Sequence, residues 1–494
     1  MTRLTVLWLA VAGCNAGDKG ISPDSGGVQE SGMDSGVSGS DSNASEDSGA
    51  DDTGTPLVAT APCDNTLLGV RAEKLCGMLE DVIIGRQTSS VFAGDGSSAT
   101  SSGTDQPILA AVSGPNTDEE LGAWVALGLS ASDLSGMDKA RAVLSAEPSE
   151  DIDGVGTAVD ASVDLDGDGY NELVLGTPFV SIRLFSEGRV LVYNGPVTTD
   201  RDLHDPDVHV DGEYDGQYFG YCLTGVPDTN DDGYDDLLVG TYLGSSPGQP
   251  TAFFRGPVED QRSSDGYAVY WRDGYYIGTS TDQADLNGDG IAELILGGVV
   301  GDDASLTGLY LLDPNLGGDV NLADVSVIYE SGDIDIYPWD VDAGDNTGDG
   351  YVDLLVLSTV RPNALYLLPG PFSTDVSTPA EGAVASIDVE PIDNGLSVGK
   401  FTGDLNGDGL SADLLVSSSE GDLYMLPAPL EGSYTQDSTP PLTRDTVNPV
   451  WFSSFSPLGD LDGDGYDDAL LGAPGDDTYA EDAGALFTLY GDAW

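Results

Sequence analysis

The chain has little positive charge. Its 494 residues include 16 lysines and arginines against 86 aspartates and glutamates, which gives a net charge of -70. A surface of this sign repels the phosphate backbone of nucleic acids, so we expect neither DNA nor RNA as a partner. The same repulsion argues against direct electrostatic binding to an anionic membrane. The acidic excess indicates a well-solvated surface, but it does not identify a partner.

Histidine is also scarce, and familiar catalytic motifs are missing. The two histidines, His204 and His209, are not spaced as in standard zinc sites, and we interpret them as solvated loop residues. The sequence contains no H-E-x-x-H, no Walker loop and no C-x-x-C motif. We therefore predict no catalytic residues and no enzyme activity. Carboxylates are so numerous that the sequence alone leaves a glycosidase-type acid pair open.

The first residues predict export. A single arginine precedes an apolar stretch that ends at Cys14, as in secretory signals. The sequence Val-Ala-Gly-Cys at residues 11–14 resembles a bacterial lipobox, which implies a lipoprotein signal peptide over residues 1–13 and a lipid on Cys14. A plain signal peptide is the alternative. No apolar run of 18 residues follows, so the lipid is the only membrane attachment we expect. We place the protein at the bacterial outer membrane or cell surface.

The next two segments lead into the folded domain. Residues 14–56 are rich in Ser, Gly and Asp, and we predict a disordered tether because they cannot bury enough apolar surface to offset the entropy of ordering. Residues 57–84 form a short segment before the main domain. Cys63 and Cys76 in this segment predict a disulfide in an exported protein, with two unrelated thiols as the alternative. We interpret the fourth cysteine, Cys222, as a small buried apolar residue.

Six acidic loops of the pattern D-x-[DNT]-x-D-G are the main feature of the sequence. They recur at intervals of about 60 residues, which is typical of a repeat architecture. They begin at Asp164, Asp228, Asp285, Asp345, Asp404 and Asp460. Oxygen-bearing side chains at positions 1, 3 and 5 can converge on one ion only if the backbone curls tightly, and the glycine at position 6 permits that curl.

The remaining ligands distinguish these loops from EF-hands. An EF-hand has a glutamate at position 12, whereas five of these loops have an acid at position 9, followed by an apolar strand. Position 7 would supply a backbone carbonyl. The loop at Asp404 has one extra residue, so its last acid is Asp413, and the loop at Asp345 has the weaker ligand Thr347. We expect about six structural Ca²⁺ ions, although a lone loop of this kind could be a solvated acidic turn. The predicted ligands are Asp164, Asp166, Asp168, Tyr170, Glu172, Asp228, Asn230, Asp232, Tyr234, Asp236, Asp285, Asn287, Asp289, Ile291, Glu293, Asp345, Thr347, Asp349, Tyr351, Asp353, Asp404, Asn406, Asp408, Asp413, Asp460, Asp462, Asp464, Tyr466 and Asp468.

Short motifs that flank the loops recur as well. A segment such as Phe219-Gly220 precedes a loop, and a strand ending in Gly472-Ala473-Pro474 follows another. This pattern resembles the FG-GAP repeat of the integrin α-subunit β-propeller. The resemblance implies an all-β, seven-bladed β-propeller of four-stranded antiparallel blades over residues 85–494. One blade would be degenerate and metal-free, with a strand near 108–115. Closing the ring would cover the sheet edges that an open array exposes.

The resemblance also suggests a function. It implies a calcium-binding adhesion or interaction module for a protein or glycan partner, which would bind on the face opposite the metal loops. The alternatives are an extracellular polysaccharide-degrading enzyme and a lectin on the same scaffold. Aromatic residues such as Trp271, Tyr275 and Tyr276 would stack on a sugar or anchor a partner if exposed; packing between blades is the other interpretation.

Overall fold

The structure is a computed structural model of the chain. It describes most of residues 154–492, with gaps at 198, 243–249, 301–306, 325–326, 331–337, 359–363, 373–381, 389–398, 419–421, 436–440, 443–451, 453 and 474–484, together with six strands between Thr60 and Ser145. The signal peptide, the tether, Cys14 and Cys63 lie outside the described residues, and only the backbone of Cys76 is described, so the predicted Cys63–Cys76 bridge stays a prediction.

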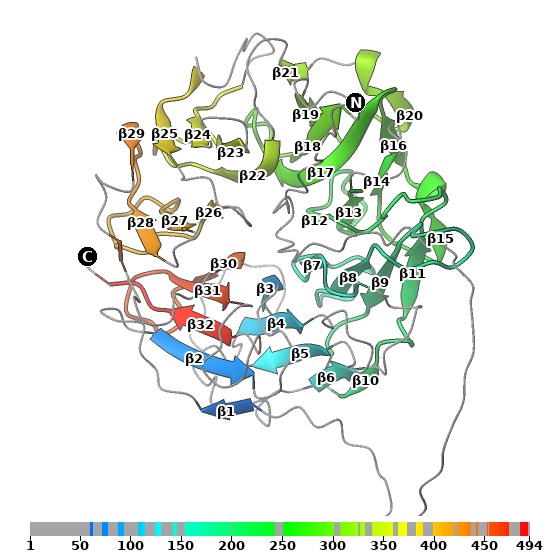
Figure 1. Cartoon of the computed structure of the whole chain (residues 1–494), viewed down its shortest axis with the longest axis horizontal. Helices are drawn as coiled ribbons and strands as arrows, with labels where there is room; N and C mark the ends of the chain where they lie inside the picture. The colour runs from blue at the N-terminus through cyan, green and yellow to red at the C-terminus, as the bar shows by residue number, and fades with distance from the viewer. Residues whose placement is uncertain are drawn as a thin grey trace, which may run out of the picture.

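The described strands form seven sheets arranged around a common axis, so the fold is an all-β propeller (Figure 1). The first three sheets along the chain contain β3 (Gln87–Phe92), β4 (Pro107–Ser113), β5 (Trp124–Leu129) and β6 (Ala142–Ser145); β7 (Val159–Asp160), β8 (Leu173–Thr177), β9 (Arg189–Tyr193) and β11 (Val208–Asp211); and β12 (Leu223–Val226), β13 (Asp236–Val239), β14 (Thr251–Phe254) and β16 (Ala268–Trp271). The named helical elements are two 3-10 turns, η4 (Ser263–Asp265) and η5 (Leu322–Asp324). In the described part of the chain, no helix is long and apolar enough to span a bilayer.

The other four sheets continue the ring. They contain β17 (Tyr275–Ala284), β18 (Glu293–Val300), β19 (Thr307–Leu312) and β21 (Val327–Glu330); β22 (Pro338–Gly344), β23 (Asp353–Ser358), β24 (Ala364–Leu368) and β25 (Ala385–Asp388); β26 (Gly399–Phe401), β27 (Leu414–Ser417) and β28 (Leu423–Leu426); and β30 (Ser454–Gly459), β31 (Asp468–Ala473) and β32 (Ala485–Leu489). The degenerate first sheet exists where the sequence predicts a strand near residue 108. Its loop before β4 lies outside the described residues.

The core lies between neighbouring sheets. The second and third strands are continuous apolar runs, and β8, β13 and β14 are buried along their whole length. Apolar and polar residues do not alternate along these strands, because each sheet packs against another sheet on both faces. One cluster, for example, joins Val174 and Val192 of the second sheet to Leu237 and Phe254 of the third.

Four short strands reach back to the preceding sheet. In each case a segment that follows a sheet's third strand pairs in parallel with the outermost strand of the sheet before it. The pairs are β10 (Arg201–Asp202) with β6, β15 (Gln261–Arg262) with β11, β20 (Gly318–Asn321) with β16, and β29 (Gly432–Tyr434) with β25. These additions cover outer edges that would otherwise expose unpaired backbone groups.

The last sheet is completed from the N-terminal side. Strand β2 (Ala72–Gly77) pairs antiparallel with β32, and β1 (Thr60–Pro62) pairs with β2 (Figure 1). Hydrogen bonds between the two ends of the chain therefore close the ring. The propeller strands thus begin at Thr60, before the boundary at residue 85 that the sequence suggested. We placed that boundary from the spacing of the repeats. The spacing contains no information about a strand that comes from outside the repeats.

The interpretation of Cys222 needs a correction. The residue is fully buried and packs beside Tyr221 and Tyr242, as an apolar residue would. It is, however, disulfide-bonded. The strand-like run around it predicted its burial but not its bond. The chain has only three other cysteines, Cys14, Cys63 and Cys76, so a Cys63–Cys76 bridge and a lipid on Cys14 exclude one another once Cys222 is bonded.

Candidate metal sites

All six acidic loops occupy the same position in their sheets. Each joins the first strand, nearest the axis, to the second strand: β7 to β8 for the first loop and β30 to β31 for the last. Because successive sheets repeat the same connection around the ring, the six loops lie on one face of the propeller. Loop positions are numbered from the first aspartate of each motif.

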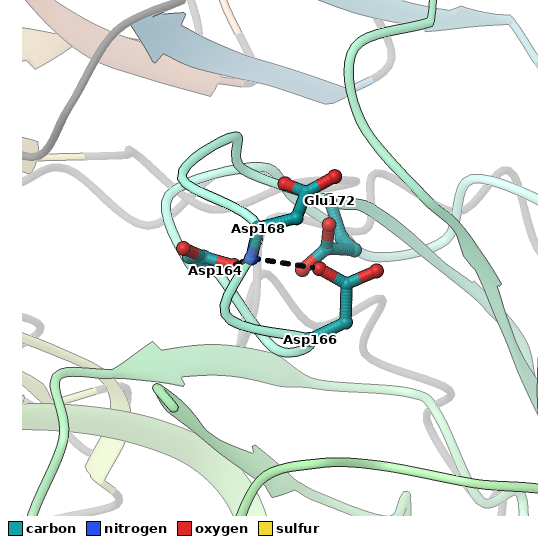
Figure 2. A group of neighbouring side chains, drawn as sticks. All are labelled: Asp164, Asp166, Asp168 and Glu172. Carbon is teal, nitrogen blue, oxygen red and sulfur yellow. Dashed lines mark hydrogen bonds between the residues drawn. The ribbon is translucent and has the colours of Figure 1, made fainter. Parts of the chain in front are cut away.

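The first loop brings four carboxylates together. Oxygen atoms of Asp164, Asp166, Asp168 and Glu172 all lie within 4.8 Å of one another, and their side chains converge in Figure 2. Asp460, Asp462 and Asp464 form a second cluster of this kind in the last loop. These two loops are the ones with an aspartate at position 3; the other four have asparagine or threonine there.

The backbone curl is the same in every loop. One carboxylate oxygen of the position 1 aspartate accepts a hydrogen bond from the position 6 glycine N–H, at 2.7–3.0 Å. All six glycines have φ between +88° and +96°. An added Cβ at these glycines would meet no atom within 4 Å, so the backbone conformation, and not lack of space, requires glycine. The role assigned to this glycine from the sequence is confirmed. The glycines are Gly169, Gly233, Gly290, Gly350, Gly409 and Gly465.

The acid that ends the loop is held from two sides in all loops but the third, where Glu293 accepts from Leu286 and Asn287 of its own loop. In the first loop, Glu172 accepts hydrogen bonds from the Leu165 N–H and, at 3.3 Å, from the Gly195 N–H beyond the third strand. Asp413 makes the same type of contact with the N–H groups of Asn406 and Ala428, at 3.2 and 2.8 Å. The extra residue in that loop therefore bulges out and leaves the last carboxylate in its usual place. Such carboxylates tie the loop to two strands of its own sheet.

Most of these terminal acids are buried. Glu172 is 1% exposed, and Asp236, Asp353, Asp413 and Asp468 are 0% exposed. Burial raises the pKa of Glu172 to about 7 and the pKa of Asp413 and of Asp468 to about 6, and acids in the same loop add to the increase. Burial also raises the pKa of Asp236, Asp353 and Glu293. A buried carboxylate beside other carboxylates is destabilised as an anion, and a bound cation would relieve that cost.

A pH dependence follows for the calcium-free protein. Because burial holds the pKa of Glu172 in the folded state above the ordinary glutamate value of 4.5, the folded state binds this proton more tightly than the unfolded state. The stability contributed by the proton is full at low pH and is lost as pH rises through about 7. We expect urea unfolding in chelator to show a free energy of unfolding that falls between pH 5 and pH 7. The variant Glu172→Gln should flatten this slope, and an unchanged slope would contradict the assignment.

The donor set fits a hard, oxygen-binding cation. Carboxylates dominate each loop, with amide or hydroxyl oxygens at position 3 of four loops. The fourth loop adds an independent sign. Thr347 Oγ1 is buried beside the Asp353 carboxylate and forms no well-aligned hydrogen bond, which is costly unless a ligand such as a cation is bound there. This is the hydroxyl that the sequence proposed as a position 3 ligand. If calcium is bound, it would supply positive charge to carboxylates that otherwise repel one another.

The structure also locates the other candidate residues. At position 7, Tyr170, Tyr234, Ile291, Tyr351 and Tyr466 each donate a backbone hydrogen bond to the position 5 aspartate, at 2.9–3.2 Å. The two histidines have separate acidic neighbours: His204 Nδ1 lies 2.9 Å from Asp202, and His209 Nδ1 lies 3.1 Å from Asp260. They do not converge on a shared site.

Among the aromatic candidates for partner binding, Tyr275 is unsuitable. Its side chain is 8% exposed and belongs to an apolar cluster between two sheets. Trp271 is partly buried and donates its indole N–H to Asp319. The packing interpretation is therefore correct for Tyr275. More exposed aromatic side chains occur at Phe185 and Tyr214, which the sequence did not single out.

Two aspartates at position 8 were also missed. Asp235 and Asp467 lie just before the terminal acids and accept hydrogen bonds from the preceding loop; Asp235 also accepts one from Asp228 of its own loop. The other loops have different residues at this position, so no repeated motif marks it. Only the contact between sheets reveals their role.

Fold and loops together define a β-propeller in which acidic loops of one type line one face. The FG-GAP repeat model matches residues 155–193 and 452–489, which contain the first and last of these loops. The chain therefore contains FG-GAP repeats, as the resemblance indicated. The matched segments cover strands β7 to β9 and β30 to β32.

Curated relatives agree with this match. The chain is 36% identical over 88 residues to integrin alpha-IIb of Homo sapiens and 37% identical over 92 residues to integrin alpha-8 of Mus musculus. Each alignment covers 18% of this chain and 8% of the integrin. The similarity thus concerns the repeat and not the rest of those proteins.

Proposed function

We propose that the protein is a calcium-stabilised propeller that serves as an adhesion or interaction module outside the cell. The observation that supports this most strongly is the repeated loop, in which a buried terminal acid with a raised pKa faces further carboxylates across a tightly curled backbone. Each loop would bind one Ca²⁺ through carboxylate, amide or hydroxyl side chains and the position 7 carbonyl. The ions would be structural, and the similarity to integrin α-subunits supports an interaction role.

A single ligand substitution tests the metal part of the proposal. Replacing Asp166 with Ala removes one carboxylate of the first cluster, so it should lower the melting temperature clearly in calcium and only slightly in chelator. In chelator the loss of a repelling charge offsets the loss of local hydrogen bonds. The exposed Asp205 lies outside the loops, and Asp205→Ala is the matched control. Equal losses in calcium and in chelator would count against a ligand role for Asp166.

The partner surface that we propose lies opposite the metal loops. Residues Leu184 and Phe185, between β8 and β9, and Tyr214, after β11, are 42%, 64% and 45% exposed. Their segments are in contact, since the Gly216 N–H donates to the Phe185 carbonyl at 2.6 Å. Exposed aromatic side chains on a fixed backbone suit a protein or glycan partner. Binding to a glycan array or to surface-labelled cells should be lost in a Phe185→Ser, Tyr214→Ser variant that melts like the wild type; retained binding would reject this face.

We also propose that the propeller is held at the cell surface by a lipid on Cys14. The lipobox-like residues 11–14 and the signal-like stretch before them support this. Labelled palmitate should be incorporated into the wild-type protein and not into Cys14→Ser. Release of both proteins into the medium in equal amounts would contradict the anchor.

A further inference from the structure

We propose that neighbouring metal loops are coupled, so that an ion in one loop strengthens binding in the next, with Asp235 and Asp467 as the positioning residues. The inference rests on the calcium sites proposed above and concerns a different property of them. It divides the loops into two coupled groups, one containing the loops at Asp164 and Asp228, the other the loops at Asp345, Asp404 and Asp460. The loop at Asp285 belongs to neither group.

Asp235 joins the first loop to the second. Its carboxylate accepts one hydrogen bond from the Asp164 N–H at 2.9 Å and another from the Asp228 N–H at 3.0 Å. Its own N–H donates to the Asp164 carbonyl at 2.9 Å. One side chain therefore fixes the backbone of the position 1 ligands of two different loops. The carboxylate is partly buried, which strengthens such charge-assisted bonds.

Asp467 repeats the arrangement between the fifth and sixth loops. Its carboxylate accepts a hydrogen bond from the Asp404 N–H at 2.8 Å, and its N–H donates to the Asp404 carbonyl at 2.9 Å. In both pairs the position 8 aspartate of the later loop holds position 1 of the earlier loop.

Position 7 side chains make a second connection. The ring of Tyr234 lies over Gly167, where an added Cβ would come within 2.9 Å of it. Tyr466 covers Gly407 in the same way, with a corresponding distance of 2.5 Å. In each pair, the position 7 residue of the later loop rests on the position 4 glycine of the earlier loop. The ring of the later loop thus packs directly on the backbone of the earlier loop.

The fourth and fifth loops are joined by other side chains. Leu410 packs over Gly348, at 2.6 Å from an added Cβ. The buried Asn346 donates to the Ala412 carbonyl at 2.7 Å and accepts from the Leu430 N–H at 2.9 Å. This set of contacts extends the second group to three consecutive loops.

Among the described residues, the third loop has no aspartate bridge and no side chain over its position 4 glycine; its Leu286 does share an apolar cluster with Val352 of the fourth loop. The third loop has Ala292 at position 8, which offers no carboxylate to the second loop. On its other side, an added Cβ at Gly288 would meet nothing within 4 Å, and position 8 of the fourth loop is Val352. The division into groups follows from these differences in residue type and packing.

Coupling follows because an ion orders the loop that it binds. If an ion in the second loop fixes Asp228 and the ring of Tyr234, the first loop loses less freedom when its own ion binds. The effect must be reciprocal, because it is a free energy shared by two sites. Couplings between sites are typically about 5-fold or more in affinity.

Hydrogen exchange followed by mass spectrometry tests this on the whole protein. A peptide that covers 164–172 reports protection of the first loop as calcium is titrated in. We expect Asp235→Asn to raise the calcium concentration at half-protection by about 5-fold or more. Asp232→Ala, which removes a ligand of the second loop, should raise it as well, whereas Asp289→Ala in the third loop should leave it within about twofold of the wild type.

The matched control is Asp231→Asn. It removes the same charge from the same loop at an exposed residue whose φ of +58° asparagine tolerates. It should leave the midpoint of the first loop unchanged. The coupling is rejected if Asp235→Asn leaves that midpoint at the wild-type value, or if Asp231→Asn moves it equally. No calcium-dependent protection in the wild type would reject the metal sites themselves, and the coupling with them.

Discussion

Removal of calcium should lower the melting temperature of the full-length protein by about 10 °C or more. Each ion that binds only the folded state adds about 2.7 kcal/mol at a hundred times its dissociation constant. Without ions, the carboxylates within the first loop repel one another, and so do those within the last loop, because no positive charge compensates them. Calorimetry in excess calcium and in chelator measures the difference directly.

The control for this experiment separates specific binding from screening. Sodium chloride at matched ionic strength weakens repulsion between exposed carboxylates, so it should recover only a small part of the loss. Magnesium should recover less than calcium, because it requires a stricter octahedron and gives up its waters reluctantly. Full recovery in sodium chloride would show that the acidic loops are only solvated turns.

Removal of residues before 85 should destabilise the propeller severely. A chain that begins at residue 85 lacks β1 and β2, so the edge of β32 has no partner and the ring is not closed by hydrogen bonds. An unpaired strand edge is also a template for aggregation. We expect this chain to aggregate or to melt well below the full-length protein, as measured by size-exclusion chromatography and circular dichroism.

A chain that begins at residue 57 is the matched control. All chains are compared in a reducing agent, so that the Cys222 disulfide makes no difference between them. The chain from residue 57 keeps both strands, so its melting temperature should equal that of the full-length protein. A synthetic peptide of residues 57–84, added to the shorter chain, should restore part of the lost stability. If chains beginning at 57 and 85 melt alike, β2 does not close the ring.

The sequence predicts most of the repeated architecture. Local signals are strong: the glycine at position 6 needs positive φ, and the strand after each loop is a short apolar run such as β13. The pairing of β2 with β32 has no local signal, because the two strands lie at opposite ends of the chain. Short additions such as β10 have only two residues and no apolar pattern to mark them. Such non-local pairings become visible only in the folded structure.

In the candidate site, too, local features could be predicted and non-local contacts could not. The terminal acid of each loop could be predicted, including Asp413, because each motif ends with an acid before an apolar strand. Asp235 and Asp467 were missed because their function depends on a neighbouring sheet. The bonded state of Cys222 was missed for a similar reason, since a disulfide depends on which residues the fold brings together.

Metal content tests the calcium sites most directly. The full-length protein, dialysed to equilibrium against buffered calcium, can be analysed by inductively coupled plasma mass spectrometry with a chelator-dialysed sample as the blank. We predict about six calcium ions per chain, and about one fewer in a variant whose first loop carries Asp164→Ala and Asp166→Ala. A wild-type protein with no calcium above the blank would contradict the proposed role of the acidic loops.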